Sequence, residues 1–109
     1  MQPATSRRAT RMADSIMREL GRIILEEAQD PRLDLVTITG VRMNKDLSIA
    51  LVLYTHYQGH SQELEQALSS ARGFFRSSLG HHLKMRYVPE LRFEWDNYLE
   101  DMIYDSGSQ

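Results

Sequence analysis

Two neighbouring stretches in the middle of the chain, residues 35–43 and 47–57, constrain the fold most. The first is rich in β-branched side chains and largely alternates between apolar and polar positions, and the second is apolar on both faces. Residues 44–46 between them, Asn-Lys-Asp, are a typical turn sequence. The pattern predicts a β-hairpin in which Gly40 is a candidate bulge and the second strand is central in the sheet.

A sheet with an apolar face needs helices to cover it. Apolar residues recur at spacings of three and four from Ala9 to Glu27, which is the pattern of an amphipathic helix. Pro31 disfavours helical geometry in Asp30, so this helix is expected to end just before that residue. Gly21 costs the helix stability relative to alanine, and the simplest reason for it is close approach of another element.

A second helical pattern runs from Leu64 to Leu83, and Ser61 is placed to cap its start. Gly73 lies in its interior, where glycine costs roughly 1 kcal/mol relative to alanine. We therefore predict that this helix breaks at residues 71–73, Ala-Arg-Gly, and exposes backbone N–H groups at the start of its second half.

Residues 91–95 alternate as a third strand, so the element order is helix, strand, strand, broken helix, strand. This order predicts the α+β class, with a three-stranded sheet covered by helices on one face. A chain of 109 residues is about one domain. We expect the folded domain to comprise residues 7–97, preceded by a flexible segment, residues 1–6. Residues 98–109 are expected to form an acidic extension with one docked helical turn followed by a frayed end.

The charges are unevenly distributed along the chain, although the net charge is only −2. Residues 1–22 carry five arginines against two acids, and residues 71–92 carry five basic residues against one acid. The acids concentrate in residues 23–70 and 93–109. Such asymmetry can direct a polyanion to one face, and an ordinary solvated surface is the other interpretation.

Several function classes are disfavoured by composition. No apolar run approaches the roughly 20 residues that span a bilayer, the first residues do not resemble a secretory signal, and cysteine is absent, so a soluble cytoplasmic protein is expected. No phosphate-binding glycine loop or nucleophile motif is present, which predicts no small-molecule substrate, no cofactor and no catalytic residue. The four histidines lack the spacing of a metal site and are expected to lie on the surface.

Basic residues at helical spacing are the candidate binding groups. Arg72, Arg76 and Lys84 follow one side of the second helix, and Arg86 continues beyond its end. On the first helix, four arginines form a stripe opposite the apolar face: Arg7, Arg11, Arg18 and Arg22. This stripe either contacts phosphate or only keeps the exposed face of the helix soluble. Phe74 and Phe75 are adjacent, so either one is partly exposed for base stacking or both are core residues, which we favour.

The ordered set of motifs resembles the bacterial ribosome-binding factor A family over about residues 7–97. The similar segments are Arg18-Glu19-Leu20, Asp30-Pro31-Arg32-Leu33, Val36-Thr37-Ile38-Thr39, Asp46-Leu47-Ser48, Ala71-Arg72-Gly73-Phe74-Phe75-Arg76 and Val88-Pro89-Glu90-Leu91-Arg92-Phe93. Residues 98–104 depart from the family pattern because they lack the glycine and basic residue often found there.

The resemblance implies a type II KH-like fold, with an Ala-x-Gly kink where other KH domains carry a Gly-x-x-Gly loop. It also implies a non-enzymatic, monomeric protein that binds the free 30S subunit, contacts 16S rRNA, assists its late maturation and supports growth in the cold. The RNA-binding residues are then expected to be Arg72, Gly73, Arg76, Lys84 and Arg86, with Arg11 and Arg18 from the arginine stripe. A histidine-dependent metal nuclease and a protein-interaction module without RNA contact are the alternatives.

Overall fold

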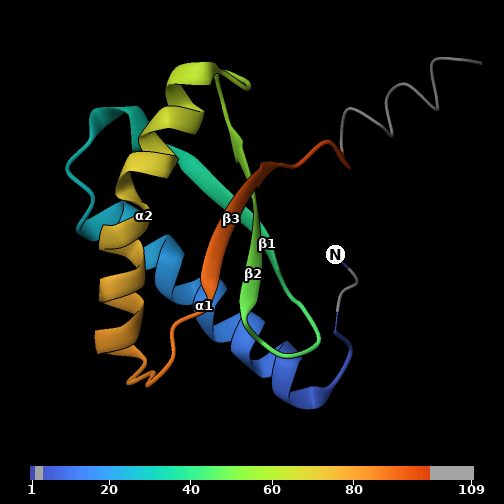
Figure 1. Cartoon of the computed structure of the whole chain (residues 1–109). Coiled ribbons are helices and arrows are strands. Elements are labelled where there is room, and N and C mark those ends of the chain that lie inside the picture. The colour runs from blue at the N-terminus through green and yellow to red at the C-terminus, as the bar shows by residue number, and fades with distance from the viewer. Residues whose placement is uncertain (2–3, 99–109) are drawn as a thin grey trace, which may run out of the picture.

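The computed structural model describes Met1 and residues 4–98 of the chain, with two helices packed on a three-stranded sheet (Figure 1). Nearly all of the predicted acidic extension, including its expected helical turn, lies outside the described residues. At the other end, the backbone N–H of Ala4 donates to the carbonyl oxygen of Met43 at 2.8 Å, which joins the start of the chain to the sheet. The domain bounds stay a prediction.

The sheet confirms the predicted hairpin and third strand. It consists of β1 (Val36–Met43), β2 (Ile49–His56) and β3 (Glu90–Trp95) in the order β1-β2-β3. β1 and β2 are antiparallel, and β2 and β3 are parallel, so β2 is central as predicted. The register of β1 against β2 shifts between Ile38 and Gly40, which confirms the bulge.

Two helices lie side by side over one face of the sheet. α1 (Arg7–Glu26) packs mainly on β1, and α2 (Gln62–His82) packs on β3. The hydroxyls of Ser6 and Ser61 accept hydrogen bonds from backbone N–H groups three residues ahead and cap the two starts. A short 3₁₀ turn, η1 (Pro31–Leu33), follows α1, which ends before Asp30 as predicted.

The core fills the space between the helices and the covered face of the sheet. Alternate residues of β2 point into this core, and the apolar faces of α1 and α2 pack against them. The largest fully buried side chains are Tyr54, Phe75, Ile16, Leu20, Ile23, Leu33, Met43, Leu68, Leu79, Leu91 and Val52. The structure confirms the α+β class with helices on one face of the sheet. The apolar residues that recur at helical spacing in the sequence are those that the two helices bury in the core or pack against it.

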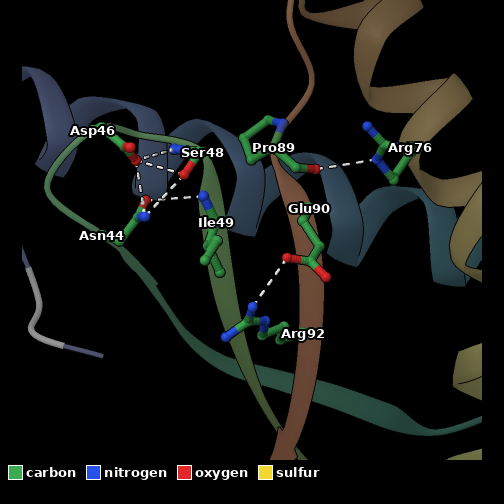
Figure 2. A network of polar contacts seen from close by, with 8 residues as sticks. All are labelled: Asn44, Asp46, Ser48, Ile49, Arg76, Pro89, Glu90 and Arg92. Atoms are coloured by element: carbon green, nitrogen blue, oxygen red, sulfur yellow. Dashed lines mark hydrogen bonds and ion pairs between the residues drawn. The ribbon is translucent and has the colours of Figure 1, made fainter.

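Polar contacts shape the turn between β1 and β2 (Figure 2). Asn44 Oδ1 accepts from the backbone N–H of Ile49 at 2.9 Å, and Asp46 Oδ1 accepts from the backbone N–H and hydroxyl of Ser48. These bonds to Ser48 hold the pKa of Asp46 below its usual value. The backbone N–H of Glu90 donates to the carbonyl oxygen of Ser48 at 2.8 Å, so the turn also fixes the start of β3.

The predicted division of the second helix is wrong, because α2 continues as one helix of 21 residues through Gly73. Helical hydrogen bonding therefore uses the backbone N–H groups that a break would have exposed. The explanation offered for Gly21 is also wrong, since a Cβ built there meets nothing within 4 Å. Neither glycine makes room for a neighbour within the described part of the protein.

Candidate nucleic-acid interface

The loop between α2 and β3 packs against the end of the helix. The backbone N–H of Met85 donates to the carbonyl oxygen of Gly80 at 3.0 Å, and Lys84 takes a left-handed conformation with φ of 53°. A Cβ built on Gly80 would lie 3.0 Å from Val88 Cγ2, so at this position glycine lets the loop approach the helix closely. The chain therefore reverses sharply and returns along α2.

Arg76 joins α2 to this loop, as Figure 2 shows. Its Nε donates to the carbonyl oxygen of Pro89 at 3.2 Å, and one terminal nitrogen donates to that of Val88 at 3.0 Å. Pro89 is buried, and β3 begins at the next residue. Arg76 was predicted as an RNA contact, and its hydrogen bonds inside the protein give it a second role, which is to hold the loop against the helix.

Three cations remain available along this side of the molecule, and we call Arg72, Lys84 and Arg86 the basic flank. All three are exposed, and none forms an ion pair with a carboxylate in the described part of the chain. Arg72 lies one helical turn before Arg76, while Lys84 and Arg86 belong to the loop that Arg76 holds. Among the described residues, the basic flank can therefore receive an anion without first breaking an ion pair.

The two adjacent phenylalanines have different environments. Phe75 is 0% exposed and packs its ring 5.8 Å from that of Phe93 on β3, measured between centroids. Phe74 is 46% exposed and lines a surface pocket that includes Ala71 and Ala28, which follows the end of α1. The favoured interpretation that both rings are core residues is therefore wrong, and the alternative of one exposed ring is confirmed.

The arginines of α1 do not join the basic flank. Arg18 lines a groove of about 1080 Å³ between α1 and β1 that no residue of α2 lines, and Arg11 lies seven residues earlier, two helical turns before it. Arg22 donates to Glu19, Glu26 and Glu27 at 2.7–3.0 Å. Hydrogen bonding with Glu19, followed by the other two carboxylates, raises the pKa of Arg22, so its charge is permanent but locally compensated.

The rings of His81 and His82 lie 5.1 Å apart, whereas His56 and His60 have separate surroundings. His60 lies 3.3 Å from a carboxylate oxygen of Glu65, and its ring is 5.5 Å from that of Trp95. His56 Nε2 is 2.9 Å from the carbonyl oxygen of Asp34. Across residues 4–98, no group of three or more His, Cys, Asp or Glu side chains is arranged to hold a metal ion. Neither described helix is sufficiently long and apolar to cross a bilayer.

The sequence-predicted site residues thus form two separate surfaces. Arg72 and Arg76 lie on α2, with Gly73 exposed between them, and Lys84 and Arg86 lie in the loop that Arg76 holds. Arg11 and Arg18 lie on α1. Tyr87 was missed: its side chain is 80% exposed beside Arg86, and an aromatic residue within a basic stretch was the signal that could have found it.

Comparison with known proteins identifies the family. The family model of ribosome-binding factor A matches residues 8–104. A ribosome-binding factor A of Thiobacillus denitrificans is 42% identical over 95 residues, which cover 85% of this chain and 77% of the relative. One from Staphylococcus carnosus is 40% identical over 107 residues, covering 90% of this chain and 92% of the relative.

Solved structures agree with these matches. The crystal structure of ribosome-binding factor A from Thermus thermophilus superposes with a TM-score of 0.69 at 30% identity, covering 79% of this chain and 93% of that one. A homology model of the Thermus thermophilus protein, fitted into a cryo-EM map of a 30S–RbfA complex, superposes at 0.64 with 24% identity, covering 86% and 97%. The similarity confirms the KH-like fold, and the chain belongs to the ribosome-binding factor A family.

Proposed function

We propose that this protein binds the free small ribosomal subunit through its RNA and assists the late maturation of 16S rRNA, with a role in growth at low temperature. It acts as a binding factor in the cytoplasm, as a monomer and without catalysis. Family membership supports the proposal, as does the 30S complex into which a structurally similar protein has been fitted. Arg72, Arg76, Lys84 and Arg86 are the proposed RNA contacts on α2 and its loop, with Arg11 and Arg18 on a second surface.

The observation that carries the proposal is the basic flank. Its three cations have no acidic partner in the part of the chain described, although the protein is acidic overall. Phosphate neutralisation by lysine and arginine releases counterions, and this release drives much of the binding to RNA. Uncompensated cations draw the phosphates of RNA to the surface that carries them.

Cosedimentation with ribosomal particles tests the proposed function. We expect the protein to pellet with free small subunits, more strongly with immature than with mature ones, and to be released as the salt concentration rises. Fully assembled, translating ribosomes are the comparison particle. Equal binding to those ribosomes contradicts the assembly role. Binding that does not change with salt contradicts the phosphate contacts.

Gly73 is proposed as the point of closest approach between helix α2 and RNA. A Cβ built there meets nothing within 4 Å in the protein, so Gly73→Ala is expected to raise the free energy of unfolding by about 0.5–1 kcal/mol, as alanine favours the helix. If RNA backbone lies against this position, the same methyl group weakens subunit binding by about tenfold, or about 1.4 kcal/mol. Urea denaturation and cosedimentation measure the two effects.

Gly21→Ala is the matched control. Gly21 is also an exposed glycine inside a helix, and a Cβ there meets no neighbour within 4 Å. We expect the same stabilisation with unchanged subunit binding, and a loss of binding in Gly21→Ala instead reports RNA contact at the groove that Gly21 shares with Arg18. A loss of stability in Gly73→Ala contradicts a regular helix at that position, and unchanged binding removes Gly73 from the interface.

A further inference from the structure

Tyr87 has the most exposed aromatic side chain among the described residues. Its exposure is 80%, against 71% for Tyr57, 65% for Tyr98 and 46% for Phe74. The guanidinium carbon of Arg86 lies 5.5 Å from the centre of its ring. The tyrosine thus stands on the surface with a cation beside it and contributes almost nothing to the core.

The backbone that carries Tyr87 is held on both sides. Before it, Met85 donates its backbone N–H to Gly80 and is half-buried against the core. After it, the carbonyl oxygens of Val88 and Pro89 accept the two hydrogen bonds from Arg76. An exposed ring on an anchored backbone loses little conformational freedom when a ligand binds, so it is pre-organised for contact.

The chemistry around Tyr87 selects the kind of ligand. Lys84 and Arg86 precede it in the same loop, and both are exposed without an ion-pair partner in the described residues. An apolar protein surface would leave these two charges unsatisfied. A single-stranded RNA segment matches both the cations and the exposed ring, because its phosphates pair with the cations while an unpaired base stacks on the ring.

We propose that Tyr87 is a base-stacking residue for an unpaired nucleotide of the bound RNA, and that Arg76 positions the loop that presents it. Lys84 and Arg86 hold the neighbouring phosphates, and the stacked base supplies binding that does not depend on counterion release. The inference rests on the proposed function, since the RNA is that of the small ribosomal subunit.

Binding to small subunits over a salt series separates stacking from charge. Tyr87→Ala is expected to weaken binding about 5- to 150-fold, the equivalent of about 1–3 kcal/mol for one stacked base, without changing the slope of affinity against salt. Tyr87→Phe is expected to bind like the unchanged protein, because the ring can stack without its hydroxyl. Both variants are expected to unfold at the same urea concentration as the unchanged protein, since the side chain is exposed.

Tyr57→Ala is the matched control, because Tyr57 is an exposed tyrosine in the turn after β2, and it is expected to bind normally. Equal binding by Tyr87→Ala and Tyr57→Ala overturns the inference. A smaller slope of affinity against salt in Tyr87→Ala also overturns the inference, because that result means that Tyr87 supports a phosphate contact and does not stack on a base. So does a loss in Tyr87→Phe as large as in Tyr87→Ala. Failure of the unchanged protein to bind small subunits refutes the proposed function instead.

Discussion

Replacing Phe75 by alanine is expected to lower the free energy of unfolding by about 3–5 kcal/mol. The side chain is 0% exposed and contacts Phe93 across the boundary between α2 and the sheet, so its removal leaves a cavity where the second helix joins β3. A domain of this size has a total stability of about 5–15 kcal/mol, and the variant is therefore close to unfolding. Urea denaturation followed by circular dichroism measures the change.

Phe74→Ala is the control for this prediction. The two positions carry the same side chain on the same helix, but Phe74 is 46% exposed, so its truncation is expected to cost less than about 1.5 kcal/mol. Equal losses in the two variants contradict the orientation of α2 described above. The comparison therefore tests the face of the helix independently of any RNA.

Removing the basic flank is expected to weaken binding strongly and to lower its dependence on salt. In the triple variant Arg72→Gln, Lys84→Gln and Arg86→Gln, three exposed phosphate contacts of about 1 kcal/mol each are lost, which weakens subunit binding by roughly 100-fold. The slope of log affinity against log salt is expected to fall by about 2–3, since each phosphate contact contributes about 0.7–0.9. Cosedimentation or fluorescence titration at several salt concentrations measures both quantities.

A second triple variant controls for net charge. Arg8, Arg42 and Lys45 are exposed cations of α1, β1 and the turn after it, and their replacement by glutamine changes the net charge equally. We expect a much smaller loss of affinity and little change in slope. Equal effects in the two triple variants indicate nonspecific attraction and contradict the assignment of the basic flank. The double variant Arg11→Gln and Arg18→Gln then reports whether α1 forms a second RNA-contacting surface.

The sequence by itself determined the order and type of the elements. Hydrophobic periodicity and turn residues are local signals, and they located the hairpin, its bulge at Gly40 and the cap at Ser61. The family resemblance also came from residues in sequence order, and the comparisons confirm it. These features need no knowledge of which elements pack together.

The tertiary structure decided what each candidate site residue contacts. The low helix propensity of glycine predicted a break at Gly73. Both halves of α2 pack on the same core, and this packing stabilises the continuous helix by more than the free energy that glycine costs it. Arg76, taken from its spacing as a free cation, is bonded to carbonyl oxygens of residues 12 and 13 positions away. Such contacts depend on how the loop folds back, and no local pattern encodes them. The same fold-back leaves Tyr87 on the surface beside the basic flank.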